Sequence, residues 1–174
     1  MSTQPIPTQP APEYRDDSRF ERIDGRWVER SVPTKKHAKV QGNLFLLLRQ
    51  QVKPLGGQAL PEWSVAQPET AERSDRNYMT PDVVAVLPPI QEAPNGYLLP
   101  PALLVVEVVL PEQSGLITKA QRYHDWGIEH VWIVDPNTRE CIEYHGGNQF
   151  TIARDELHAG DLKVRIADIF AELE

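Results

Sequence analysis

The sequence predicts an α/β domain with a mixed central β-sheet flanked by helices. Two apolar runs, at residues 83–86 and 103–109, are nearly continuous, as expected of strands that are buried on both faces. The second run is followed by a helical pattern and by a third apolar run at 131–134, and this strand–helix–strand order favours a parallel pair. The remaining predicted strands are joined by short turns, which is typical of antiparallel neighbours.

The composition fits one globular unit. The chain has 174 residues, of which 40% are hydrophobic, and its single cysteine, Cys141, leaves no internal disulfide. We expect residues 1–18, rich in proline and polar residues, to form a flexible tail and residues 19–174 to form one domain. No apolar run approaches the ~18 residues of a membrane span, and the N-terminus lacks a signal-peptide pattern. We therefore expect a reducing, cytoplasmic location and no contact with a membrane.

The N-terminal half predicts a hairpin, a helix and two strands. Residues 20–30 form the hairpin, with Asp24-Gly25 as a strong turn signal. The helix follows from Thr34, a predicted N-cap, and apolar residues recur along it at helical spacing as far as Val52. Strands are then expected at 59–65 and 81–86, with a polar loop between them.

The C-terminal half begins with a proline-rich loop at 88–101, which precedes the apolar run at 103–109. A helix is predicted from Ser114 to Trp126 and is ended by Gly127. After the strand at 131–134, alternation on both sides of Gly146-Gly147 predicts a second hairpin. We expect a strand or turn and a short amphipathic helix within residues 162–173.

Three charged residues interrupt this apolar frame. Asp82 opens the run at 83–86, Glu107 lies within the run at 103–109, and Lys119 falls on the apolar stripe of the following helix. A buried charge costs several kcal/mol or more unless it is paired or bound to a metal. Two carboxylates on neighbouring strands, with a lysine close by, form a compact site for Mg²⁺ or Mn²⁺, to which the backbone carbonyl of Val108 could add a third oxygen. This arrangement suggests phosphodiester hydrolysis.

Each of these residues also has a structural interpretation. Asp82 could cap a turn, and Glu107 could be a core glutamate that is partnered by Lys119 or His37. The lysine stem could instead pack on apolar surface while its amine reaches water. Glu29, in the strand before the first predicted helix, could approach the site as an auxiliary group. The three charged residues together are more specific than any one of them.

The net charge of −7, with a pI of about 5.3, argues against a nucleic-acid partner. The distribution softens this objection, because residues 1–50 carry nine Lys and Arg against six Asp and Glu. Lys35, Lys36 and Lys39 cluster around His37, which could contact a phosphate or be a satisfied core residue. We expect these lysines to contact DNA with weak to moderate, salt-sensitive affinity.

In their order, these residues resemble the PD-(D/E)XK superfamily, which has the restriction-endonuclease-like fold. Within it, the chain is similar to a large bacterial family of endonuclease-like proteins catalogued as a domain of unknown function. The resemblance covers roughly residues 20–170. Its marks are the segment 23–29, His37, the segments 80–83 and 104–108, Lys119 four residues before Tyr123, and the segment 127–136, which is the most distinctive.

The resemblance implies a DNA endonuclease that uses Mg²⁺ or Mn²⁺ and a cation-activated water, which attacks the phosphodiester in line and leaves a 5′-phosphate. Asp82, Glu107 and the carbonyl of Val108 would hold the metal. Lys119 and His37 would be catalytic, with Glu29 as an auxiliary. Because cutting both strands of a duplex often uses two sites, a homodimer is also expected, although no residue demonstrates it.

The chain departs from the family pattern at three positions. The superfamily name places a lysine two residues after the acidic ligand, where this sequence has Val109, so the lysine must come from the next helix. The family tends to have serine three residues after the glutamate and aspartate four before the lysine, where this sequence has Leu110 and Gly115. Loss of two polar groups introduces an alternative, a catalytically weakened or inactive nuclease-fold module that binds nucleic acid or a protein. Because the two carboxylates and the lysine are retained, the sequence still favours the nuclease.

Overall fold

The computed structural model describes Pro5 and residues 19–111 and 113–174. Apart from Pro5, the predicted tail at 1–18 lies outside the described residues. The helices are α1 (Lys35–Val52), α2 (Leu116–Trp126) and α3 (Ile166–Ile169), with 3₁₀ turns η1 (Lys53–Leu55) and η2 (Pro68–Thr70). The strands are β1 (Phe20–Ile23), β2 (Arg26–Glu29), β3 (Gln58–Pro61), β4 (Val65–Ala66), β5 (Tyr78–Met79), β6 (Val83–Val86), β7 (Gln91–Glu92), β8 (Leu98–Leu99), β9 (Ala102–Val108), β10 (Ile128–Val134), β11 (Cys141–Gly146), β12 (Gln149–Ala153), β13 (Glu156–Ala159) and β14 (Leu162–Arg165).

The central sheet is mixed, as predicted. Its strand order is β12-β11-β10-β9-β6-β3, in which β9 and β10 are parallel and the other pairs are antiparallel. The parallel pair is joined by α2, so the predicted strand–helix–strand unit is confirmed. In this unit Glu107 of β9 lies opposite Ile133 of β10.

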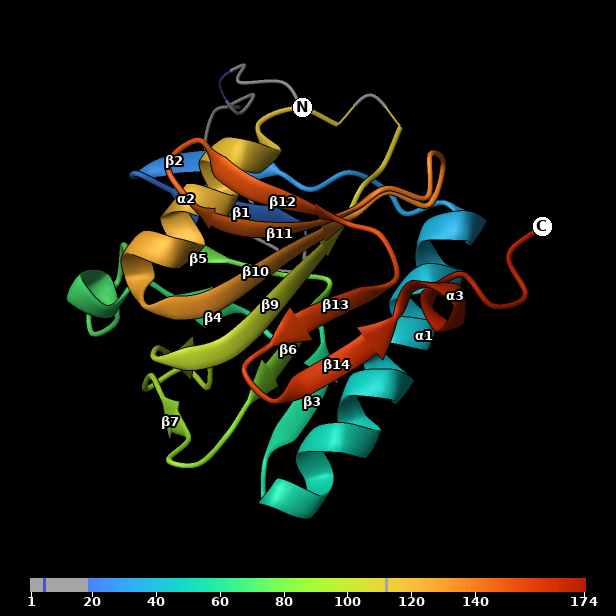
Figure 1. The fold of residues 1–174 in the computed structure, drawn as a ribbon. Coiled ribbons are helices and arrows are strands. Elements are labelled where there is room, and N and C mark those ends of the chain that lie inside the picture. Colours follow the sequence, from blue (N-terminus) through green and yellow to red (C-terminus); the bar gives the residue numbers. More distant parts are fainter. Residues whose placement is uncertain (1–4, 6–18, 112) are drawn as a thin grey trace.

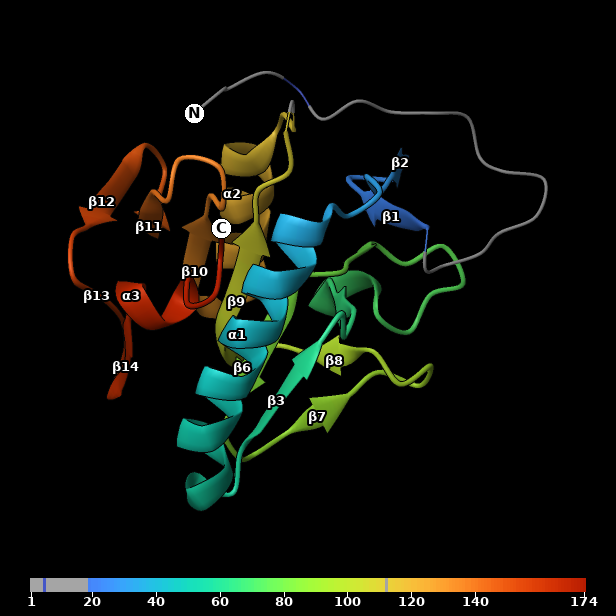
Figure 2. The ribbon, with the colours of Figure 1, turned by 90° about the vertical axis from the view of Figure 1, so that its right-hand side faces the viewer.

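Helices cover both faces of the central sheet, α1 on one side and α2 on the other (Figures 1 and 2). Alternate residues of β9 therefore enter different cores: Val106 and Val108 pack toward α1, and Val105 packs toward α2. Since Glu107 lies between Val106 and Val108, its side chain points to the α2 face. A carboxylate at this position is enclosed on both sides by apolar layers.

A second six-stranded sheet was not predicted. Its order is β2-β1-β5-β4-β8-β7, and four of its strands have only two residues. The strand expected at 59–65 was wrong, because it is split into β3 and β4, which belong to different sheets. Glu62 between them has a φ of +54°, which turns the chain out of extended conformation. The expected loop at 88–101 likewise contains β7 and β8, and the C-terminal strand β14 pairs with the unpredicted β13.

The predicted turn at Asp24-Gly25 and the predicted N-cap at Thr34 are confirmed. The β1–β2 turn has positive φ at both central residues, Asp24 at 52° and Gly25 at 76°, as a tight hairpin requires. Thr34 caps α1, because its hydroxyl accepts a hydrogen bond from the backbone N–H of His37 at 3.2 Å.

Among residues 19–111 and 113–174, no helix has the length and apolar character needed to cross a membrane.

Candidate active site

Asp82 and Glu107 lie next to each other on adjacent strands. Val83 of β6 pairs with Val106 of β9, so the antiparallel register brings Asp82 beside Glu107. The backbone N–H of Asp82 donates to the carbonyl of Val106 at 3.1 Å, and Asp82 Oδ2 accepts from the N–H of Val108 at 2.7 Å. The two predicted carboxylates and the predicted carbonyl donor, Val108, are thus brought together.

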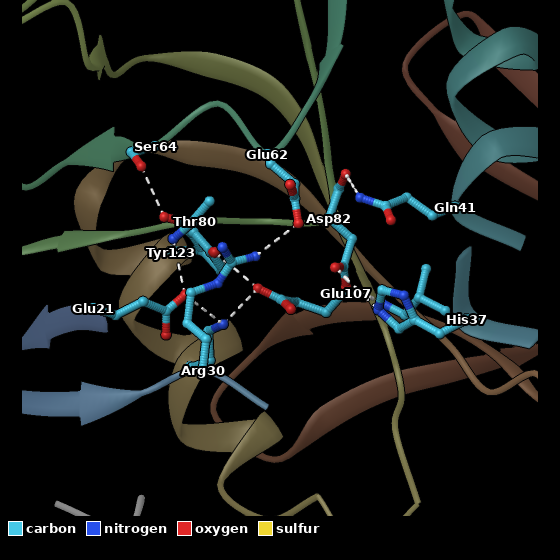
Figure 3. Close-up of polar contacts among 12 residues, drawn as sticks. Glu21, Arg30, His37, Gln41, Glu62, Ser64, Thr80, Asp82, Glu107 and Tyr123 are labelled. Carbon is cyan, nitrogen blue, oxygen red and sulfur yellow. Dashed lines mark hydrogen bonds and ion pairs between the residues drawn. The ribbon is translucent and has the colours of Figure 1, made fainter. Parts of the chain in front are cut away.

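Two side chains of α1 hold Asp82 from the opposite side of the sheet (Figure 3). Nε2 of His37 lies 3.1 Å from Asp82 Oδ1, and the Gln41 side-chain amide donates to the carbonyl of Asp82 at 2.9 Å. His37 is buried, and its other ring nitrogen, Nδ1, has no hydrogen-bond partner within the described part of the chain. Because only an Nε2–H can donate to the carboxylate, the geometry favours that tautomer.

Lys119 of α2 joins two buried carboxylates. Its Nζ lies 2.8 Å from Glu107 Oε1 and 2.9 Å from Glu21 Oε1. The hydroxyl of Tyr123, one helical turn further on, donates to the same Glu107 oxygen at 2.8 Å. Glu21 Oε1 also accepts from the backbone N–H of Thr80 at 2.8 Å. The lysine is therefore fixed as a shared partner and does not extend into solvent.

Burial and neighbouring charges shift the pKa values of this cluster. The pKa of Glu107 is raised to about 7. Burial is the largest cause, the charges of Asp82 and Glu21 act in the same direction, and the charge of Lys119 opposes the shift. Burial disfavours the ammonium of Lys119, but the attraction of Glu107 and Glu21 outweighs it, so the pKa of Lys119 is raised above its ordinary value. Lys119 is consequently a permanent cation at neutral pH.

The cluster opens into a pocket of about 160 Å³. Asp82, Glu107 and Lys119 are only 6%, 4% and 8% exposed, so their polar atoms form its floor. The other lining residues come from β1, β2 and α1, from the connections that follow β2, β3 and β5, and from β9 and the β9–α2 connection: Glu21, Val28, Glu29, Arg30, Ser31, Pro33, His37, Glu62, Thr80, Val108, Leu110, Gln113 and Ser114. A group that enters this pocket would therefore meet Asp82, Glu107 and Lys119 together.

The other predicted residues surround this pocket. Glu29 lines it near the surface, where its carboxylate lies 3.3 Å from the guanidinium of Arg19. Lys35 and Lys36 are exposed on the first turn of α1, and Lys39 is half-buried on the next turn. These lysines lie on the helix that carries His37, which places positive charge beside the pocket without placing it at the floor.

Glu21, Arg30 and Tyr123 complete the site, although the sequence analysis did not assign them to it. Arg30 lies 3.2 Å from Glu62 through its guanidinium. Burial opposes its charge, but Glu21, Glu62 and Glu107 raise its pKa above the ordinary value. One signal could have identified Glu21: it lies two residues before the buried Ile23 in β1, so both side chains point to the same, inward face of the strand.

One of the departures from the family pattern, Leu110, lies at the pocket, whereas Gly115 lies at the start of α2. Leu110 lines the pocket and is buried, so an apolar side chain stands where the family tends to have serine. Gly115 is the N-cap of α2 with a φ of +76°, and no side chain caps this helix. Leu110 changes the wall of the pocket, and Asp82, Glu107 and Lys119 remain in contact with their partners.

The donor set fits a hard divalent cation. Three buried carboxylates, Glu21, Asp82 and Glu107, face one buried ammonium, and this excess of negative charge contributes to the raised pKa of Glu107. The described ranges hold no group of three or more His, Cys, Asp or Glu side chains arranged to bind a metal. Mg²⁺ is commonly held by one or two carboxylates, and water completes its coordination shell. The oxygen atoms of Asp82, Glu107 and the Val108 carbonyl are therefore ligands of the type and number that Mg²⁺ requires from a protein.

Two buried acidic residues on adjacent strands of a mixed sheet, with a lysine from the following helix, define a protein of the nuclease-like PD-(D/E)XK class. The model of the Uma2 family, described as "putative restriction endonuclease", matches residues 9–174, and the chain belongs to this family. None of the curated proteins matches the chain.

Two solved structures are similar to the chain. One is described as "a putative nuclease belonging to DUF820" from Anabaena variabilis, with 21% sequence identity, a TM-score of 0.71, and coverage of 91% of this chain and 93% of that one. It confirms the fold. The other is a DrdV–DNA complex, with 13% identity, a TM-score of 0.35, and coverage of 79% of this chain and 13% of that chain.

Proposed function

We propose that the protein is a metal-dependent DNA endonuclease that hydrolyses phosphodiester bonds. The observation that carries this proposal is the convergence of Asp82, Glu107 and Lys119 on one pocket, with each carboxylate held by its own partners. Buried, oriented charges of this kind are costly for stability and are characteristic of sites that act on charged substrates. Membership of a family described as "putative restriction endonuclease" supports the same activity.

Asp82, Glu107 and the Val108 carbonyl would hold Mg²⁺ or Mn²⁺. The bound cation would supply Lewis-acid activation of water and would neutralise charge on the phosphate. His37 and Gln41 keep Asp82 in one orientation, because they hold its carboxylate and its backbone carbonyl respectively. Tyr123 fixes Glu107 by a hydrogen bond to Oε1.

Lys119 acts as a fixed positive charge in this proposal. Its raised pKa keeps the amine protonated at neutral pH, so it does not serve as a general base. Its ammonium, held between Glu21 and Glu107, would stabilise the charge that develops on the phosphoryl oxygens. Arg30 supplies a second cation at the pocket wall, and Lys35, Lys36 and Lys39 would contact the DNA backbone outside it.

A second function is favoured by one observation, the apolar wall that Leu110 gives to the pocket. A nuclease-fold module with weakened or absent catalysis would bind nucleic acid or a protein through the same surface. It would keep this binding when Asp82 is replaced, because the binding would not depend on the cation.

A supercoiled-plasmid nicking assay with Mg²⁺ or Mn²⁺ separates the two functions. Wild type should nick the plasmid only with added metal, and Asp82→Asn and Glu107→Gln should each lower the rate at least about 100-fold, since each removes a ligand charge. Glu92→Gln is the matched control, because Glu92 is exposed on the edge strand β7. Equal nicking by all variants would indicate a contaminant, and no nicking by wild type would favour the binding module.

A further inference from the structure

A second pocket of about 480 Å³ adjoins the catalytic pocket, and the two share Leu110, Gln113 and Ser114 in their walls. We propose that this second pocket holds one unpaired base of the DNA strand whose backbone occupies the catalytic pocket. The inference rests on the proposed function and deepens it, because it makes an unpaired strand the preferred substrate.

The register of the central sheet fixes the position of the second pocket. Ile133 is the β10 neighbour of Glu107, and Ile142 is the β11 neighbour of Ile133. Neighbouring strands lie about 4.8 Å apart, so the floor of the second pocket begins one strand away from the catalytic glutamate. Both isoleucines pack on the α2 side of the sheet, to which Glu107 also points. A nucleotide with its phosphate near Glu107 can therefore place its base over them.

The floor of the second pocket is aliphatic, formed by Val109, Leu116, Ile133 and Ile142. These side chains are buried, apart from Val109, which is partly buried. A base presents two flat faces with little hydrogen-bonding capacity, and enzymes that take up an extruded base enclose it between apolar side chains. An apolar floor of this size suits such a group.

The charge of the rim excludes a phosphate as occupant. Asp135 and Glu140 line the second pocket, and neither lysine nor arginine does so. One oxygen of Asp135, Oδ1, accepts hydrogen bonds from the backbone N–H groups of Asn137 at 2.8 Å and Thr138 at 3.2 Å, which fixes the carboxylate. Within the described residues Oδ2 has no partner, so it remains an acceptor directed by a rigid turn.

Two carboxylate acceptors select the kind of base. An ionised carboxylate only accepts hydrogen bonds, so it favours a group that presents N–H donors. Guanine, adenine and cytosine each carry an exocyclic amino group, whereas thymine presents two carbonyls and one N–H. The chemistry of the rim therefore favours an amino-bearing base over thymine.

The depth of the catalytic pocket supports an unpaired strand. The catalytic side chains are almost fully buried at its floor, and a base that is stacked in a duplex cannot enter a neighbouring pocket without leaving its partner. Single-stranded or locally unpaired DNA avoids the cost of that unpairing. We therefore expect it to be cleaved faster than intact duplex.

A cleavage experiment with abasic substrates tests this assignment. Single-stranded oligonucleotides carry one abasic residue at each position around the cleaved bond, and one such position should lower the wild-type rate about tenfold. In Val109→Phe, which fills the second pocket, intact and abasic substrates should be cleaved equally. Leu55→Phe, an enlargement at an exposed position of η1, is the matched control and should behave as wild type.

Binding of free nucleosides distinguishes failure of this inference from failure of the proposed function. Millimolar deoxyguanosine, deoxyadenosine or deoxycytidine should shift the methyl resonances of Val109, Leu116, Ile133 and Ile142 more than thymidine does, and Val109→Phe should abolish the shifts. Cleavage that is insensitive to every abasic position would overturn the inference and leave the nuclease intact. Nucleoside binding without cleavage would support the second pocket and reject the nuclease, and neither binding nor cleavage would reject both.

Discussion

Tyr123 is, with Lys119, one of two residues of α2 that restrain Glu107. Its hydroxyl is fully buried and donates to Glu107 Oε1, which also contacts Lys119. Removal of one donor leaves the carboxylate with a single strong partner, and a lost buried hydrogen bond costs about 1–3 kcal/mol. The contact therefore links the stability of the helix to the orientation of a proposed metal ligand.

We predict that Tyr123→Phe lowers the free energy of unfolding by about 1–2 kcal/mol and raises the Mg²⁺ concentration needed for half-maximal nicking. Urea titration and a metal titration of the nicking rate measure the two effects. Tyr144→Phe is the control, because the Tyr144 hydroxyl is bonded to Gln121 and Gly147 away from the carboxylates. An equal change of metal dependence in both variants would contradict a specific role for Tyr123.

Glu107 predicts a pH dependence of stability. Its pKa rises from an ordinary 4.5 to about 7 in the folded protein, so the native state binds its proton more tightly than the unfolded chain does. The contribution of Glu107 to the free energy of unfolding is therefore fully present below about pH 4.5 and is lost as the pH rises toward 7. In metal-free buffer, Glu107→Gln should remove this loss, which is on the order of a few kcal/mol.

The measurement is the free energy of unfolding of wild type and Glu107→Gln at pH values from 5 to 8. The difference between the two should move in favour of the variant as the pH increases. Glu92→Gln is again the control, since an exposed carboxylate should give a profile parallel to that of wild type. Parallel profiles for Glu107→Gln would show that Glu107 is ionised across the whole range.

At the scale of elements, the start of α1 matters because it sets the position of His37. The Thr34 hydroxyl accepts from the His37 backbone N–H, and the His37 ring contacts Asp82. Thr34→Ala should lower the free energy of unfolding by about 1 kcal/mol, whereas Thr34→Ser should retain most of it because serine keeps the capping oxygen. Urea denaturation of the three proteins checks this, and equal losses in both variants would exclude a capping role.

The elements that the sequence predicted correctly are those with long, regular patterns. The apolar runs of β6 and β9, the helical stripe of α1 and the unit β9–α2–β10 each extend over enough residues for the pattern to be clear. The second sheet could not be predicted in this way, because β4, β5, β7 and β8 have two residues each and no period can be observed in two residues.

The site was predictable in part for the same reason. Glu107 and Lys119 could be identified because each interrupts an apolar pattern, and Asp82 because it stands at the start of one. Glu21 contacts Lys119 across 98 positions of sequence, and this contact depends on how β1 is placed against α2. Only tertiary structure provides that placement, so a short strand with a polar inward residue resembled an ordinary hairpin.

At the scale of the whole molecule, a net charge of −7 opposes binding to DNA, so affinity must come from local positive charge. We predict that replacing Lys35, Lys36 and Lys39 by glutamine makes DNA binding weaker and reduces the steepness of its salt dependence. Each lost phosphate contact reduces the slope of log K against log salt by about 0.9. Fluorescence anisotropy measures the slope between about 50 and 200 mM salt, the range in which the loss of DNA affinity is large. The control replaces Lys53 and Lys163, and an equal effect there would indicate nonspecific attraction.

The proposed cation should stabilise the whole fold, because it would bind a site that exists only when β6 and β9 are paired. A ligand at 100 times its Kd adds about 2.7 kcal/mol by mass action, and about 1 kcal/mol shifts Tm by roughly 2–4 °C for a chain of this size. Mg²⁺ or Mn²⁺ should therefore raise the Tm of wild type by several degrees at constant ionic strength. Asp82→Asn should abolish this rise. Without metal, its Tm should exceed that of Glu107→Gln if the repulsion between Asp82 and Glu107 outweighs the contact of Asp82 with His37. Glu92→Gln should respond to metal as wild type does, and a metal response that survives Asp82→Asn would place the cation elsewhere on the molecule.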